Sequence, residues 1–136
     1  MKATELMIGD WVLYEGEPYQ IRQLGIYGEN RDGEDYPAVC IGKPKGIGLI
    51  VERNEIEPIT LTAEILEKNG FVKSKYGEMI LDEELGTSEI YIVLEPTYDE
   101  AYYWWRVNNE LITKIKNIHE LQHMLRLCNI DKEIEL

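Results

Sequence analysis

The stretch 61–71, Leu-Thr-Ala-Glu-Ile-Leu-Glu-Lys-Asn-Gly-Phe, carries the strongest structural signal in the chain. Thr62 is a good helix N-cap because its hydroxyl can accept a hydrogen bond from a free backbone N–H of the first turn. Gly70 can take the left-handed conformation that ends a helix. The two leucines have the spacing of a hydrophobic staple, and the final phenylalanine can close back on the second leucine. These signals predict a short helix near residues 62–69 that is fixed at both ends.

Length and composition indicate a globular chain. Its 136 residues allow one domain or two small ones, and the 44% of hydrophobic residues suffice for a packed core. The apolar run Ile90–Leu94 is too short to span a bilayer, and residues 1–5 are not followed by the apolar stretch of a signal peptide. We therefore expect a cytoplasmic protein in which Cys40 and Cys128 are free, buried thiols.

The charge balance limits the choice of partner. The chain holds 26 acidic and 14 basic side chains, a net charge of −12. Nucleic-acid binding needs clustered lysine and arginine, so we expect no direct binding to nucleic acid. An acidic surface serves solubility, and it also attracts a basic surface on another protein.

The first part of the chain reads as short strands joined by glycine turns. Alternating or apolar segments occupy residues 10–14, 19–24, 36–41 and 48–51, a spacing typical of a small barrel or sandwich. The opening Leu6-Met7-Ile8-Gly9-Asp10-Trp11-Val12, followed by Gly16 and Ile21, resembles SH3-like barrels of the KOW and Tudor type, in which a Gly-Asp turn starts a hairpin. This resemblance implies an SH3-like small β-barrel over residues 1–57.

The second part alternates strand and helix signals. Strands are expected at 71–74, 78–81, 88–94, 101–107 and 110–115, with a helix over 117–128 and a possible edge strand in the tail, 131–136. We therefore predict an α+β fold: the barrel is followed, over residues 58–136, by an antiparallel sheet with helices near 62–69 and 117–128. One compact domain is the alternative.

The two helical segments also carry a second resemblance. Leu61-Thr62, Ile65-Leu66 and Asn69-Gly70-Phe71, together with Ile118-His119-Glu120-Leu121-Gln122, resemble a group of small uncharacterised proteins from gut-bacterial genomes and their phages and mobile elements. The resemblance implies a phage-related or mobile-element gene and brings no activity with it.

A short metal motif lies on the second helix. His119-Glu120-Leu121-Gln122-His123 fits H-E-x-x-H, in which two histidines bind zinc and the glutamate is the general base. The chain after His123 holds neither the glycine nor the further histidine of familiar zinc proteases. Asp131, Glu133 and Glu135 are conceivable third ligands outside any familiar frame.

The periodicity of this helix favours a structural interpretation of the motif. An apolar stripe predicts that both histidines project to solvent on the opposite side; its members are Ile118, Leu121, Met124, Leu125 and Cys128. With Asn117 as the N-cap, Glu120 has the position of a capping-box acid. We therefore predict surface histidines, no metal site and no catalytic residue. A zinc-dependent hydrolase using His119, Glu120 and His123 is the alternative.

An aromatic segment at 98–105 is the second candidate site. On a strand, Tyr103, Trp105 and Val107 face one way, while the opposite face carries Tyr102, Trp104 and Arg106. Exposed aromatic rings can bind peptides, sugars or bases, although aromatic side chains are also common in cores. We take the face with Tyr102, Trp104 and Arg106 as a candidate binding surface, and a peptide- or ligand-binding module as an alternative function.

A polar loop over 28–35 is the third candidate, because its acidic side chains Asp32, Glu34 and Asp35 surround a glycine. The spacing does not fit a calcium loop, so we expect a solvated acidic surface.

Together these features favour a non-enzymatic interaction module without a cofactor, in which this acidic loop and the aromatic face bind a basic protein. One version is inhibition of a basic host nuclease or DNA-binding protein by imitation of nucleic-acid charge.

Overall fold

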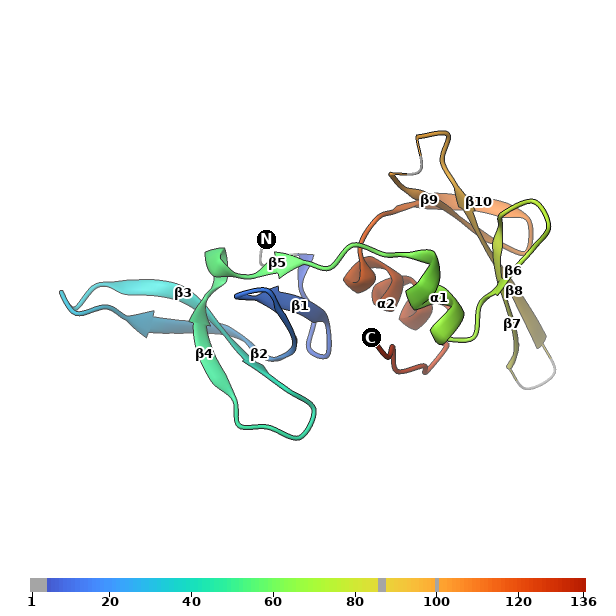
Figure 1. The fold of residues 1–136 in the computed structure, drawn as a ribbon. Coiled ribbons are helices and arrows are strands. Elements are labelled where there is room, and N and C mark those ends of the chain that lie inside the picture. The colour runs from blue at the N-terminus through green and yellow to red at the C-terminus, as the bar shows by residue number, and fades with distance from the viewer. Residues whose placement is uncertain (1–4, 86–87, 100) are drawn as a thin grey trace. The chain divides into compact units, whose positions relative to one another are not determined.

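The computed structural model describes residues 5–85, 88–99 and 101–136 of the chain. It divides into two compact units, Met1–Ile59 and Thr60–Leu136. Each unit has its own antiparallel five-stranded sheet, and both helices belong to the second unit (Figure 1). The chain is therefore a mixed fold of two sheets and two helices, which agrees with the predicted α+β class.

The first unit is a single sheet in the order β4-β3-β2-β1-β5. Its elements are β1 (Trp11–Tyr14), β2 (Glu17–Glu29), β3 (Asp35–Gly42), β4 (Leu49–Glu52), the 3₁₀ turn η2 (Arg53–Glu55) and β5 (Glu57–Pro58). Figure 1 shows β2 and β3 running on together as a two-stranded hairpin beyond the other strands. The hairpin tip is the turn of residues 30–34.

The small β-barrel predicted over residues 1–57 is not formed, because this sheet is open and β4 and β5 are its two edges. β5 pairs with β1 only through Val12–Pro58 and Leu13–Glu57. A strand of two residues whose proline has no N–H to donate cannot close the sheet against β4.

The first unit has one aliphatic core cluster. Its buried members are the strand residues Val12, Ile21, Val39, Ile41 and Val51, together with Leu6 and Ile56 from segments outside the strands. Gly9 has φ +93° and lies in the turn before β1, where its N–H donates to the Ile21 carbonyl over 2.8 Å. The Asp10 carboxylate is fully buried and accepts from the Met7 N–H over 2.7 Å. The Gly-Asp pair thus fixes the entry to β1.

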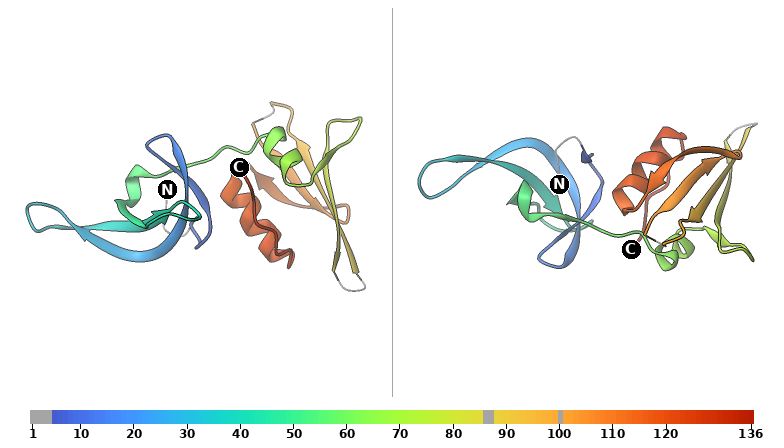
Figure 2. Two further views of the ribbon diagram at one scale, coloured as in Figure 1. Left: turned by 60° about the horizontal axis from the view of Figure 1, so that its bottom comes forward. Right: turned by 90° about the horizontal axis from the view of Figure 1, so that it is seen from above.

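The second unit is a sheet in the order β10-β9-β8-β7-β6, with two helices on one of its faces (Figures 1 and 2). The elements are α1 (Ala63–Lys68), β6 (Val72–Lys73), β7 (Met79–Leu85), β8 (Ser88–Pro96), β9 (Tyr103–Val107), β10 (Glu110–Ile115) and α2 (Ile118–Leu127). Alternate strand residues and the helices form the core, whose fully buried members include Met79, Ile92, Leu94, Trp105, Ile115, Leu66, Ile118, Leu121 and Leu125.

The ends of α1 follow the local sequence. The Thr62 hydroxyl accepts from the Ile65 N–H over 3.3 Å, and the Phe71 N–H donates to the Leu66 carbonyl over 3.0 Å. Gly70 has φ +93°, so the helix ends in the left-handed conformation that the sequence predicts. Leu66 is fully buried, which ties this short helix to the core.

The tail does not form the edge strand that its alternation predicts. The Asn69 amide holds it instead: its Nδ2 donates to the Glu135 carbonyl and its Oδ1 accepts from the Glu135 N–H, each over 2.7 Å. Ile134 is buried beside this contact. One side chain thus replaces a strand partner and anchors the C-terminal residues to the end of α1.

Replacing Thr62 with alanine is expected to lower the free energy of unfolding by about 1 kcal/mol, because an N-terminal N–H of α1 loses its acceptor. Thr60→Ala is the matched control, since Thr60 is exposed and outside the helix. Urea unfolding followed by circular dichroism measures both. Equal losses in the two variants would show that the cap does not stabilise the unit.

Candidate functional site

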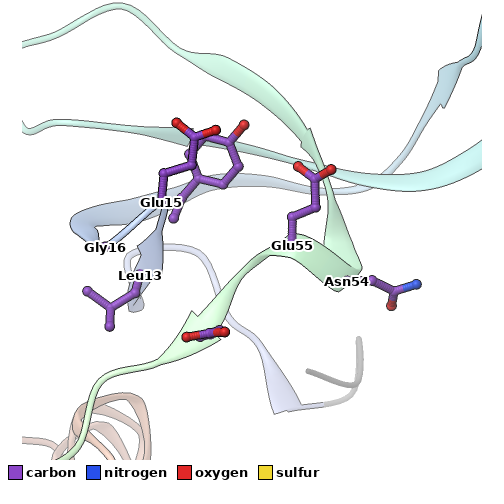
Figure 3. Close-up of a pocket in the computed structure, with 7 residues that line it drawn as sticks. Leu13, Glu15, Gly16, Asn54 and Glu55 are labelled. Carbon is purple, nitrogen blue, oxygen red and sulfur yellow. The ribbon is translucent and has the colours of Figure 1, made fainter.

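A depression of about 460 Å³ lies at the turn between β1 and β2 of the first unit (Figure 3). Glu15 and Gly16 form this turn with φ values of +50° and +77°. Asn54 and Glu55 of η2 and Glu57 of β5 also line it, together with Leu13 and Tyr14. The pairing of β1 with β5 therefore brings three carboxylates from distant parts of the sequence around one tyrosine.

A second depression of about 500 Å³ adjoins the first and shares Tyr14 and Glu55 with it. The whole of β4 lines it, and the remaining lining residues are Glu29, Asn30, Arg31 and Tyr36 at the β2–β3 hairpin. We call the two depressions together the acidic groove. Its carboxylates are Glu15, Glu29, Glu52, Glu55 and Glu57.

The groove carboxylates have no salt-bridge partner in the part of the chain that the structure describes. Two ion pairs elsewhere in that part of the chain join Lys43 to Glu17 over 3.5 Å and Arg106 to Glu95 over 3.1 Å. Burial raises the pKa of the Tyr14 phenol above its ordinary value, and the negative charges of Glu15 and Glu55 raise that pKa further. The groove is therefore a concave, negatively charged surface with aromatic rings in its lining.

Tyr14 is expected to ionise at a higher pH than an ordinary tyrosine, and Glu55→Gln is expected to lower its pKa toward 10.0. The folded-state pKa lies above the unfolded value. Tyr14 therefore contributes stability that is present below the unfolded pKa and is lost as the pH rises through the folded one. A pH titration of ¹³C-labelled tyrosine by NMR measures the shift. Glu67→Gln is the control because it removes the same charge at an exposed position of α1 that does not line the groove. An unchanged Tyr14 titration in Glu55→Gln would contradict this electrostatic coupling.

The predicted loop residues Asp32, Glu34 and Asp35 are all exposed at the tip of the β2–β3 hairpin. The Asn30 side chain orders this tip, because its Oδ1 accepts from the N–H groups of Asp32 and Glu34 over 3.0 and 2.9 Å. The three acidic residues do not line the groove. They follow directly after residues 29–31, which do.

The predicted aromatic face belongs to the second unit. Tyr102 is exposed and Trp104 is half-buried, whereas Trp105 on the opposite face is fully buried. The Lys114 ammonium lies 5.1 Å from the Tyr102 ring centre and 5.3 Å from that of Trp104. These three residues line a depression of about 410 Å³ with Thr97, Tyr98 and Asp99. Arg106, the third predicted residue of this face, pairs with Glu95 instead.

The prediction that the histidines of α2 face solvent is wrong. His119 is 5% exposed, and His123 is half-buried, with its ring 5.6 Å from that of His119. Glu120 caps the helix, since its Oε1 accepts from the Asn117 N–H over 3.0 Å, as predicted. Gln122 is buried as well, so the buried arc of α2 is rotated away from the predicted apolar stripe.

The described residues were searched for metal-binding groups and for membrane-spanning helices. No group of three or more His, Cys, Asp or Glu side chains in that part of the chain is placed to hold a metal ion. Within the same residues, no helix has the length and apolar character needed to cross a membrane.

Cys40 and Cys128 are free thiols, each half-buried rather than fully buried. Burial raises the pKa of the Cys128 thiol.

Comparison with known proteins identifies no relative: no family model, no curated protein and no solved structure matches this chain.

Sequence reasoning missed the groove itself. The segment 14–17 reads only as a strand end and a turn, and 52–57 only as a polar connection. Each segment carries acidic residues, and that is the one available signal. Their meeting depends on the pairing of β1 with β5, which the two-residue length of β5 hides from pattern analysis.

Proposed function

We propose that this chain is a non-enzymatic protein-interaction module whose acidic groove binds a basic segment of a protein partner. The observation that carries the proposal is the groove itself, with carboxylates lining two adjoining depressions that share Tyr14 and Glu55. A lysine or arginine side chain in the groove would gain charge-assisted hydrogen bonds from these carboxylates. It would also gain cation–π attraction from the Tyr14 or Tyr36 ring.

The same surface extends to the hairpin tip. Asp32, Glu34 and Asp35 lie next in the chain to the groove residues 29–31, so they add negative potential at one end of the groove. This potential would speed the approach of a basic partner and orient it before contact.

The partner in this proposal is a basic protein, and the chain binds neither nucleic acid nor a membrane directly. We propose a cytoplasmic protein of phage or mobile-element origin, with a basic host nuclease or DNA-binding protein as one version of the partner. The proposed origin rests on the resemblance of the two helical segments, the proposed relation to SH3-like domains rests on the Gly9-Asp10 turn before β1, and the net charge of −12 supports a basic partner.

Binding of a blocked peptide of alternating lysine and valine tests the proposal, because this probe supplies the basic charge without any other protein. Isothermal titration calorimetry with the full chain is expected to show binding at about 50 mM salt and a loss of about tenfold or more at about 300 mM salt. A glutamate–valine peptide of the same length is the control and is expected not to bind. Absence of lysine–valine binding at low salt, or binding insensitive to salt, would overturn the proposal.

A second candidate is ligand binding at the aromatic face, favoured by the depression that Tyr102, Trp104 and Lys114 line together. A ligand seated there would change the environment of the half-buried Trp104. Tryptophan fluorescence that responds to the lysine–valine peptide in the parent but not in Trp104→Phe would favour this face over the groove.

A further inference from the structure

The two sheets present four edge strands in the described residues, and three of them are protected against pairing. β5 and β6 are two residues long, and β5 contains Pro58. β10 carries a bulge between Leu111 and Thr113 and a lysine at position 114. Short edges, proline, bulges and lysine are the features that prevent a further strand from adding to a sheet.

β4, the remaining edge, has no proline, bulge or lysine, and with four residues it is longer than β5 and β6. Its sequence is Leu-Ile-Val-Glu, and its four residues pair with β3 in an unbroken register from Ile41–Leu49 to Ala38–Glu52. Leu49 is 43% exposed and Ile50 is 59% exposed. An unprotected apolar edge is a template for strand addition.

The outward backbone groups of β4 are available for such pairing. A central strand bonds on two sides, whereas β4 has β3 on one side only. Apart from that ladder and the turn η2, which begins directly after Glu52, the described residues make no hydrogen bond to the backbone of Leu49–Glu52. An extended peptide would satisfy these N–H and C=O groups through its main chain.

The second depression of the acidic groove adjoins this strand. All four residues of β4 line it, and Glu29, Tyr36, Tyr14 and Glu55 line the rest. Successive side chains of an added strand point to opposite faces. A segment that alternates basic and apolar residues would therefore direct its cations to the face of Ile50 and Glu52 and its apolar side chains to the face of Leu49 and Val51.

We propose that the basic partner segment binds in extended form as an added strand on β4, with alternate basic side chains directed to Glu29, Glu52 and Glu55. This mode of binding rests on the proposed function and specifies the partner chemistry: an extended segment of alternating basic and apolar residues. Main-chain hydrogen bonds supply affinity, and the groove carboxylates select the charge and fix which face of the segment points inward.

Two N-methylated forms of the lysine–valine peptide test the added strand. One carries N-methyl groups on every lysine and the other on every valine, so length and charge stay the same. Only one set of peptide N–H groups faces β4 when the groove fixes the position of the lysines. We expect one form to lose about tenfold or more in affinity and the other to bind like the parent peptide.

The outcomes separate this inference from the proposed function. If both forms bind like the parent, the added strand is wrong and the basic-segment proposal stands. If the parent peptide itself does not bind, both are wrong. If both N-methylated peptides bind weakly, amide hydrogen exchange in the complex with the unmethylated peptide tests whether a strand is added to β4. Slower exchange at alternate residues of Leu49–Glu52 supports the strand, and unchanged exchange there overturns it.

Discussion

Replacing Glu52 and Glu55 together with glutamine is expected to weaken binding of the lysine–valine peptide by about tenfold or more. Each carboxylate contributes up to about 1 kcal/mol in a partly exposed ion pair, and about 1.4 kcal/mol corresponds to tenfold in affinity. Glu55 lines both depressions of the groove and Glu52 lies on β4, so the pair stands at the proposed contact. Isothermal titration calorimetry at low salt measures the change.

The matched control is Glu64→Gln with Glu67→Gln on α1. Both residues are exposed and lie in the second unit, and their replacement changes the net charge by the same amount. We expect the control to bind almost like the parent. Equal losses in the two double variants would show that the peptide responds to overall charge, and the groove would lose its role.

Replacing Trp105 with alanine is expected to destabilise the second unit by about 3–5 kcal/mol, which is a large share of the total stability of a small domain. Trp105 is fully buried at the centre of β9, where it pairs with Leu94 of β8 and Thr113 of β10. Removal of its ring leaves a cavity that the sheet and helices cannot fill.

Trp104→Ala is the comparison, because Trp104 is the next residue of the same strand and points to the opposite, half-exposed face. We expect it to cost about 1 kcal/mol or less. Denaturant unfolding followed by far-ultraviolet circular dichroism measures both variants without relying on tryptophan emission. Similar losses in the two variants would contradict the assignment of one core face and one open face to β9.

Local signals predicted the ends of the helices well. Thr62 and Gly70 stand at the two ends of α1, and Glu120 caps α2, because each of these roles depends on neighbours within a few residues. The hairpin turn between β9 and β10 also depends on local sequence, because Asn108 and Asn109 tolerate the positive φ that they adopt there.

The orientation of α2 could not be predicted in the same way. An apolar stripe marks the side of a helix that prefers burial, but the neighbouring elements decide how wide the buried arc is. In α2 the arc includes His119 and Gln122, while Met124 and Cys128 are only half-buried. For this reason the prediction that both histidines project to solvent was wrong.

Sheet closure and the groove depend on pairing between distant segments. The spacing of the early strands is compatible with either a barrel or an open sheet, and the two-residue β5 leaves the sheet open. The same short strand holds Glu57 opposite Leu13 and next to the Tyr14 depression. A single sequence contains no local signal for such a pairing, so the groove had to come from the structure.

Titration of the lysine–valine peptide into the ¹⁵N-labelled full chain, followed by NMR, tests the central claim most directly. Binding in the acidic groove predicts that the largest shift changes fall on Tyr14, Leu49–Glu52 and Glu55, with little change at Tyr102 and Trp104. The largest changes at Tyr102 and Trp104, or equal small changes along the whole chain, would contradict a binding site in the groove.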